Sequence, residues 1–474
     1  MCSRWRLQYI HAGNALKIIS ITFAGLALYP RVADALDIGY NIGYGMEYSD
    51  NIYLADENAQ GDPAVDPTTQ VAEEYTHGIF AGFQLRENSP ALDARLDVNG
   101  LYRNYIRDTY PDEVLMGVGA NVLWRISPQR FQWVFDDLFT QAPVNSLDPM
   151  TPSNRQNTNV LTTGPDYFMR LSPVHTLALS GRYINSYYET STLNDERYTG
   201  NVAWLYSATA RTIYSLNYDY LNVNYEVPDP AANRNDYERH DGFVRIDWRT
   251  GRNTVTWDLG YTAIDRDESD PVAGRLGRFV WLHRITRNTN FRLNTRAEFS
   301  DVNQDLANTS VAVDSLPAGT IVDGDIFYTN RAEAYFSKTG SSFNQDYRAL
   351  WVRDEYEESP LDNVRWGGNF NLVYTFPSAT FSVFLNGDYL VTKYQDEELD
   401  RTDREKRAGT GMTYQIISTV SLNLIYRWTD VESIGANPGR SYKENRVLLT
   451  ISYNSNPRLG SISNTSNFSS SRSR

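Results

Sequence analysis

The sequence predicts an all-β fold, a transmembrane antiparallel up-and-down β-barrel of about 20 strands, and three observations carry this prediction. Apolar side chains alternate with small or polar ones in strand after strand. Short turns alternate with long loops, and an export signal precedes the first strand. A membrane barrel needs the alternation in every strand, because lipid contacts one face of its wall and the aqueous lumen contacts the other.

The first predicted strand, residues 36–49, alternates without a break. One face is apolar and aromatic, and it carries Leu36, Ile38, Tyr40, Ile42, Tyr44, Met46 and Tyr48. The other face is small and polar, and it carries Asp37, Gly39, Asn41, Gly43, Gly45, Glu47 and Ser49. Strict period-two alternation over this length is typical of a strand with two different environments.

The same alternation recurs to the end of the chain. Clear examples lie at residues 92–99, 114–126, 214–220, 255–263, 291–299 and 420–428. The alternation is weaker at residues 131–140, 157–171, 237–248 and 275–285, so about 18 strands is the nearest alternative to about 20. Either even number places both termini in the periplasm, as in bacterial single-chain barrels.

The connections between strands are of two kinds. Short turns, such as residues 127–130 and 286–289, alternate with longer charged loops, such as residues 140–157 and 301–325. Outer-membrane barrels have short periplasmic turns and longer external loops, so this asymmetry also predicts how the barrel is oriented.

Residues 1–35 have the features of a secretory signal peptide. Basic residues precede a short apolar stretch at residues 18–28, and Ala33-Asp34-Ala35 forms a small-x-small cleavage site. An uncleaved membrane anchor is the alternative, but the apolar stretch is short for a spanning helix. We therefore expect a barrel over residues 36–454, and a disordered, Ser-rich periplasmic tail over residues 455–474.

Composition agrees with an exported barrel. Only 41% of the 474 residues are hydrophobic, while aromatic residues reach 13%, with 33 Tyr and 10 Trp, as expected for aromatic girdles at the membrane interfaces. The net charge of −14 argues against nucleic-acid binding, which needs a basic surface. A soluble β-sandwich or propeller is the alternative fold, but it would need large apolar side chains on its inward faces.

A barrel this wide is expected to enclose a pore, because 16 to 18 strands already leave an aqueous channel. Charged residues on the polar faces of the strands are the candidate lumen-lining residues. They are Asp93, Arg95, Asp97, Asp219, Asp247, Arg292, Arg296, Glu298, Arg331, Glu333, Asp388 and Arg427. Such mixed charges can orient polar solutes in a transverse field, or they can pair across strands and stiffen the wall. The sequence leaves both interpretations open.

Catalytic motifs are lacking. Outside the predicted signal peptide the histidines are His77, His175, His240 and His283, and none of them has metal-ligand spacing or belongs to a recognisable triad. We expect no enzymatic activity, no cofactor and no metal. A lipid-modifying outer-membrane enzyme remains the alternative from another functional class.

Two short motifs add a family resemblance. The first is Tyr48-Ser49-Asp50-Asn51-Ile52-Tyr53, and the second runs from Pro152-Ser153-Asn154-Arg155-Gln156-Asn157 to Thr163-Gly164-Pro165-Asp166. Together they resemble outer-membrane β-barrels of the β-barrel porin group that is associated with exopolysaccharide and exosortase (PEP-CTERM) systems. Leu161-Thr162-Thr163 departs from the Phe-Ser-Thr-like stretch expected there.

The resemblance implies a role in exopolysaccharide export in the bacterial outer membrane. The residues themselves predict passage of polar solutes, and a plugged barrel that anchors a polysaccharide or protein-sorting assembly is the alternative. The expected partners are outer-membrane lipids and lipopolysaccharide, a polar solute or polysaccharide, and the barrel-assembly machinery.

Overall fold

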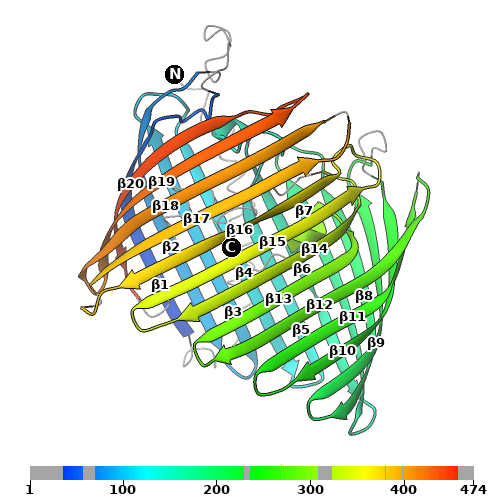
Figure 1. Cartoon of the computed structure of the whole chain (residues 1–474). Coiled ribbons are helices and arrows are strands. Elements are labelled where there is room, and N and C mark those ends of the chain that lie inside the picture. The colour runs from blue at the N-terminus through cyan, green and yellow to red at the C-terminus, as the bar shows by residue number, and fades with distance from the viewer. Residues whose placement is uncertain are drawn as a thin grey trace, which may run out of the picture.

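The computed structural model describes residues 36–56, 70–228, 235–267, 269–307, 323–378, 380–397 and 399–456, and these residues form a closed β-barrel (Figure 1). The predicted signal peptide lies outside the described residues. So does the predicted tail, except for Ser455 and Asn456, and Ser455 continues alongside the first strand by a hydrogen bond from its backbone N–H to the Tyr40 carbonyl.

Twenty strands are present within the described residues. They are β1 (Leu36–Ser49), β2 (Glu74–Asn88), β3 (Leu92–Tyr105), β4 (Glu113–Ser127), β5 (Phe131–Ala142), β6 (Gln156–Arg170), β7 (His175–Tyr188), β8 (Asp195–Thr209), β9 (Thr212–Tyr225), β10 (Tyr237–Arg249), β11 (Asn253–Arg266), β12 (Val272–Thr286), β13 (Thr289–Ser300), β14 (Phe327–Thr339), β15 (Phe343–Tyr356), β16 (Asn363–Thr375), β17 (Phe381–Tyr394), β18 (Arg401–Ile417), β19 (Val420–Gly435) and β20 (Tyr442–Asn454).

Each strand pairs antiparallel with its neighbours in sequence, and β1 pairs with β20 to close the sheet. The prediction of an antiparallel up-and-down barrel of about 20 strands is confirmed. The four segments of weaker alternation are also strands, namely β5, β6, β10 and β12.

Within the described residues, the loops contain two short helical segments, a 3-10 turn η3 (Pro152–Asn154) and a helix α2 (Val302–Ala307). In the part of the chain that the structure describes, no helix is long and apolar enough to cross a membrane.

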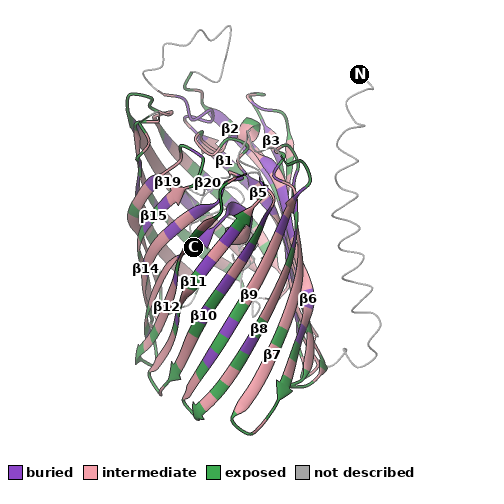
Figure 2. Ribbon diagram, turned by 90° about the vertical axis from the view of Figure 1, so that its right-hand side faces the viewer, coloured by how far each residue is buried: buried purple, intermediate pink, exposed green. Residues whose placement is uncertain are grey.

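Burial along the strands is reversed relative to a soluble protein. On β1, the side chains of Ile38, Tyr40 and Ile42 are about half exposed, at 48%, 51% and 52%. On the opposite face of the same strand, Asn41 and Glu47 are only 6% and 4% exposed. Figure 2 shows buried and exposed residues alternating along the strands of the wall. The apolar side chains therefore cover the outside of the barrel.

The polar faces of the strands line the concave side of the wall. The concave side is identified by a cluster of apolar side chains that share a face with the polar ones. Its members are Phe80 (β2), Leu101 (β3), Ile425 (β19) and Leu448 (β20), with Phe384 (β17) packed against them. Side chains from strands this far apart around the wall can meet only across its concave side. The pairing register links their faces to those of Asn41 and Glu47 on β1.

Glycine on the inner face of β1 makes room for this cluster. A Cβ atom at Gly43 would overlap the ring of Phe80 and would lie 2.7 Å from the backbone oxygen of Ile451 on β20. The small residues on the inner face of β1 therefore allow close packing at the place where the barrel closes.

The segment Tyr48–Tyr53 has a structural role at the closure of the barrel. Asp50 accepts hydrogen bonds from the backbone N–H (2.7 Å) and the side-chain amide (2.6 Å) of Asn445 on β20. Asn51 accepts from the backbone N–H of Ala55 at 3.0 Å and donates to its carbonyl at 2.8 Å. These residues hold the start of the β1–β2 loop and connect it to the last strand.

The second motif extends into β6, and its Gly164-Pro165 step does not end this strand. β6 continues through Gly164-Pro165, and its ladder with β7 keeps the same register on both sides of these two residues. Proline has no N–H to donate to the ladder, and Arg182 on β7 instead donates a side-chain hydrogen bond to the Pro165 carbonyl at 2.9 Å.

We expect Gly43→Ala to destabilise the barrel by about 1–3 kcal/mol, because the new methyl group needs the Phe80 ring or the β20 backbone to move. Urea unfolding of the refolded protein measures this effect. Gly242→Ala on β10 is the matched control, because a Cβ there meets no heavy atom within 4 Å. Equal unfolding midpoints for the two variants would contradict the packing described for Gly43.

Candidate functional site: the lumen wall and two inward loops

The candidate site is the inner wall of the barrel and the loops that fold into its mouth. The pairing register places all the predicted lumen-lining residues on the concave face, and they lie on seven different strands. They are Asp93, Arg95 and Asp97 on β3, Asp219 on β9, Asp247 on β10, Arg292, Arg296 and Glu298 on β13, Arg331 and Glu333 on β14, Asp388 on β17, and Arg427 on β19. That they line a conducting pore stays a prediction.

The structure brings some of these residues together. Arg296 and Arg331 lie opposite each other on neighbouring strands. Arg296 lies 3.8 Å from the carboxylate of Glu298 on its own strand, and Arg331 forms an ion pair with Glu333. On the distant strand β3, Arg95 and Asp97 form a separate pair at 2.5 Å.

Other predicted residues stand apart from these pairs. Asp388 lies opposite Arg407 on β18, and Arg427 lies opposite Arg446 on β20. Arg292 donates to the side chain of Asn294 at 2.9 Å. Some of the inner charges therefore pair within the wall, and the idea that they orient polar solutes stays a prediction.

Three further charged residues on the inner wall were not among the predicted lumen-lining residues. Arg245, Asp258 and Arg278, on β10, β11 and β12, lie opposite one another across the three strands and form part of the same row as Arg296. Two of them fall in the segments of weak alternation. There the inward positions also hold apolar residues such as Phe243 and Leu276, which hide the pattern.

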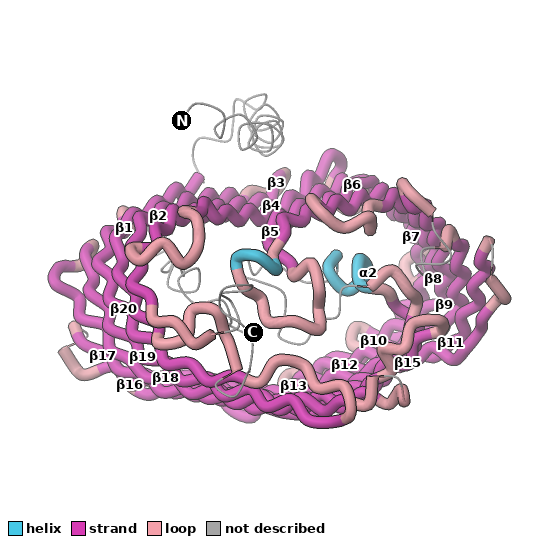
Figure 3. The backbone as a smooth tube through the Cα atoms, turned by 90° about the horizontal axis from the view of Figure 1, so that it is seen from above, coloured by secondary structure: helices cyan, strands magenta, loops and turns pink. Residues whose placement is uncertain are grey.

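The β5–β6 loop, residues 143–155, reaches across the mouth. Figure 3 shows this loop, with η3, inside the ring of strands. At its far side, Nη2 of Arg401 at the start of β18 donates to the backbone carbonyl of Leu147 at 2.9 Å. Six strands separate β5 from β18 around the wall, so this contact crosses the opening instead of following the sheet.

The base of the β5–β6 loop is held by charge and by an asparagine. Arg155 pairs with Glu113 on β4 at 2.7 Å. The side-chain amide of Asn154 donates to the carbonyls of Asn145 (2.8 Å) and Pro149 (3.1 Å), and its oxygen accepts from the Asn145 N–H at 2.8 Å. The loop is thus folded on itself, held at its base by β4 and at Leu147 by β18.

A second loop, which follows β13, begins inside the barrel. Asp301 accepts hydrogen bonds from Arg197 on β8 at 2.9 and 2.6 Å, and from the hydroxyl of Tyr237 on β10 at 2.7 Å. Arg197 also pairs with Asp195 at 2.6 Å, and the side chains of all three charged residues are at most 2% exposed. In Figure 3, α2 lies just inside the wall beside these strands.

Asp301 keeps its charge in this buried place. Burial alone would raise the pKa of its carboxyl, but the positive charge and hydrogen bonds of Arg197, with the hydrogen bond from Tyr237, outweigh burial and lower the pKa. The ion pair therefore persists near neutral pH, and it is lost only as the pH falls through this lowered pKa.

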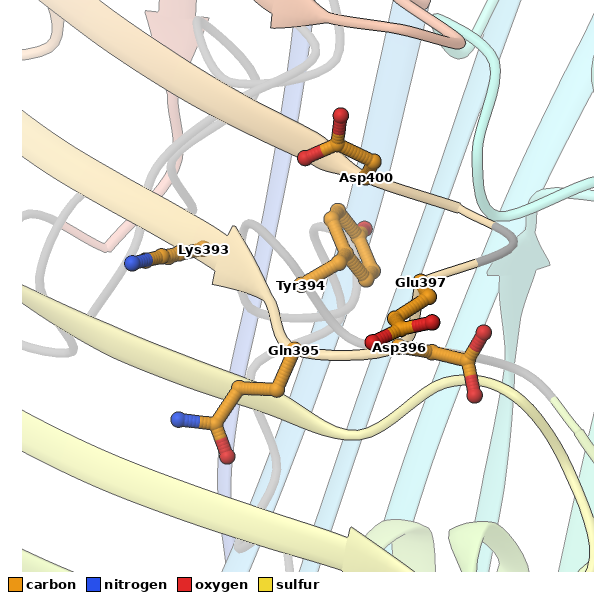
Figure 4. A pocket seen from close by; sticks show the side chains of 6 residues that line it. All are labelled: Lys393, Tyr394, Gln395, Asp396, Glu397 and Asp400. Carbon is orange, nitrogen blue, oxygen red and sulfur yellow. The ribbon is translucent and has the colours of Figure 1, made fainter.

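A hollow of about 560 Å³ adjoins the far anchor of the β5–β6 loop. Figure 4 shows its lining, which includes Tyr394, Asp396, Glu397 and Asp400. Tyr394 also lies beneath the Arg401 guanidinium, with 5.8 Å from Cζ to the ring centroid. Within the described residues, no three acidic, His or Cys side chains are grouped as a metal site.

No protein-family model and no curated protein sequence matches the chain. Among solved structures, the FrpB iron transporter from Neisseria meningitidis (F3-3 variant) is similar with a TM-score of 0.45 and 9% identity, over 87% of this chain and 81% of that one. Pseudomonas aeruginosa OccK2 (OpdF) in complex with glucuronate has a TM-score of 0.36 and 11% identity, over 89% and 99%. A BenF-like porin from Pseudomonas fluorescens Pf-5 has a TM-score of 0.37 and 11% identity, over 88% and 99%.

We expect Arg401→Ala to release the β5–β6 loop, because it removes a charged hydrogen bond worth about 1.5–3 kcal/mol. The measurement is the rate at which proteinase K cleaves within residues 143–155 of the refolded protein, and the rate should rise about tenfold or more. Arg404→Ala is the matched control, since Arg404 pairs with Glu432 and both side chains are over 40% exposed. An unchanged cleavage rate for Arg401→Ala would show that this contact does not hold the loop.

We also expect the local stability around Asp325, just before β14, to depend on pH. Burial raises the pKa of Asp325 to about 6, although hydrogen bonds from the Ser359, Glu358 and Ile326 N–H groups oppose the rise. A raised carboxyl pKa means that the folded form prefers the protonated acid, so local stability falls as the pH rises from about 4 to about 6. Hydrogen exchange of the Ser359 amide, corrected for its intrinsic rate, should show less protection at pH 7 than at pH 4.

Asp325→Asn is the control for that measurement, because an amide keeps the acceptor oxygen and cannot ionise. Its protection should not change over the same pH interval. A wild-type profile that is equally flat would overturn the assignment of the raised pKa to Asp325.

Proposed function

We propose that this protein is an outer-membrane channel that passes polar solutes through a lumen narrowed at one end by the β5–β6 loop. One observation carries the proposal. The barrel is closed, apolar side chains are exposed on its outer face, and its charged and amide side chains lie mainly on the inner face.

The exterior supports a place in a membrane. Large apolar side chains are exposed on strands all around the barrel, including Ile79, Leu216, Leu259, Leu385 and Ile451, each at 46–57%. Soluble proteins rarely expose continuous apolar surface of this extent. The strands have 12 to 17 residues, and about 9–11 are enough to cross the hydrocarbon layer.

The closed ladder of backbone hydrogen bonds also supports a location in a membrane. Every strand pairs on both sides, so no edge strand would present unpaired backbone groups to lipid. Insertion would depend on the barrel-assembly machinery, and the exposed loops would lie among lipopolysaccharide. Both partners belong to the proposal.

The width of the barrel supports a pore. Side chains alone do not fill a barrel of 16 or more strands. The β5–β6 loop and α2 both lie inside the ring of strands, which favours a selective channel over a wide one.

A finer substrate, exopolysaccharide, rests on the resemblance of the two short motifs alone. In the structure, Asp50 and Asn51 hold the closure between β1 and β20 and do not reach into the lumen wall. We therefore propose polar solutes as the general class of substrate and exopolysaccharide as one member of it.

A plugged barrel that anchors a surface assembly is the second candidate, and the two inward loops are the observation that favours it. An enzymatic role has no comparable support, because no group of residues described above forms a nucleophile with a base.

Conductance of the purified protein in a planar lipid bilayer tests the proposal. We expect discrete channels, and we expect deletion of residues 144–153 to increase the single-channel conductance because it removes the span across the mouth. Arg404→Ala, which removes only the exposed ion pair with Glu432, is the control and should leave conductance unchanged.

Absence of channels in the wild type together with channels in the deletion variant would favour the plugged barrel. Absence of channels in both would overturn the proposal of a solute pathway.

A further inference from the structure

A row of arginines crosses the inner wall of strands β10 to β15. Arg245, Arg278, Arg296 and Arg331 lie in one line of the pairing register, and Arg348 on β15 adjoins it. The carboxylates that pair with them are Asp258, Glu298 and Glu333. Five arginines thus share three carboxylates.

The first pair shows how the charges are layered. Arg245 and Asp258 form a two-pronged ion pair, with Nε to Oδ1 and Nη2 to Oδ2 both at 2.7 Å. The Asp258 side chain is 1% exposed and the Arg245 side chain is 37% exposed. The carboxylate therefore lies against the wall, and the guanidinium faces the lumen.

The next pairs repeat this layering. Nε of Arg278 donates to Glu298 at 2.6 Å, and the two side chains are 27% and 6% exposed. Glu333 is 7% exposed beneath Arg331, which is 25% exposed. A solute in the lumen therefore meets guanidinium groups before it meets the carboxylates beneath them.

An aromatic ring fixes two of these arginines in place. Phe243 on β10 is 4% exposed, and the guanidinium carbons of Arg245 and Arg278 lie 5.5 and 5.6 Å from its ring centroid. Stacking on an aromatic ring and pairing with a buried acid both restrict an arginine side chain. Two of the five N–H groups of Arg245 are used by Asp258, and the exposed part of the group can donate to a solute.

Two acids beside the row limit its long-range field. Asp219 on β9 accepts a hydrogen bond from Asn201, and Asp247 on β10 accepts one from Thr256 at 2.7 Å. Because these charges offset the surplus of arginines, recognition here would depend on direct contact with the guanidinium groups and not on net charge.

We propose that Arg245 and Arg278, held over Phe243, form a binding subsite for organic solutes that carry a carboxylate, such as acidic sugars. The proposal rests on the proposed function in that the lumen is the path of the solute. Guanidinium and carboxylate groups match in planar, paired hydrogen-bond geometry, which gives the subsite its preference for an acid over a neutral sugar.

Binding of galacturonate and of galactose to the detergent-solubilised, refolded protein tests the subsite by isothermal titration calorimetry. We expect the wild type to bind galacturonate at least about tenfold more tightly than galactose, as one charge-assisted hydrogen bond would supply. The double variant Arg245→Gln/Asp258→Asn removes one guanidinium and leaves the net charge unchanged. It should lose most of this preference.

Arg404→Gln is the control, because Arg404 lies on the outward face of β18 and pairs there with Glu432, so the preference of this variant for galacturonate should remain. If Arg245→Gln/Asp258→Asn does not refold, Arg278→Gln/Glu298→Gln makes the same test from the other side of the ring. An unchanged preference in the refolded double variant would overturn the subsite, as would a wild type that does not distinguish the two sugars.

Conductance separates this inference from the proposed function. Galacturonate should block the channel current of the wild type at lower concentration than galactose, and the difference should shrink in the double variant. Binding without any channel current would contradict the solute pathway and leave the subsite standing. A current that galacturonate and galactose affect equally would contradict the subsite alone.

Discussion

The pairing of β1 with β20 is the interaction on which the rest of this structure depends. It closes a ladder of twenty antiparallel strands, so each strand has a partner on both sides. Closure gives the wall a concave and a convex face, and period-two alternation then assigns every side chain to one of them. Asp50 and Asn445 strengthen this junction at one end of β1, and the glycine face of β1 lets Phe80 pack over it.

Inside the closed barrel, charged side chains form two kinds of contact. On the wall, buried carboxylates hold arginines in fixed positions, with the guanidinium groups toward the lumen. At the mouth, loops are fixed by contacts with strands that are distant in sequence, from Arg401 on β18 to Leu147 and from Arg197 on β8 to Asp301. Pairs with a buried carboxylate cost desolvation energy, and what they supply here is a fixed arrangement of the arginines and of the loops.

The strands could be predicted from the sequence because alternation is a local property. Residues 36–49 carry the full pattern of β1, and its limits in the structure are the same. The same pattern predicts that the side chains of Arg296 and Glu333 face the inside of the barrel. The inward loops could not be predicted, because Leu147 and Arg401 meet only after the sheet has closed and nothing near either residue marks the contact. The Phe243 subsite was missed for a related reason, since an apolar residue at an inward position weakens the alternation that identifies the strand.

The central claim is that alternation along each strand separates lipid from water. Nitroxide labels at successive positions of β17 in reconstituted vesicles test it directly, since the only cysteine of the chain is Cys2. Labels at Leu385 and Tyr389 should be more accessible to oxygen, which concentrates in lipid. Labels at Asn386 and Asp388 should be more accessible to a water-soluble nickel complex. Accessibility that does not alternate between these neighbouring positions would contradict a membrane barrel with a polar lumen.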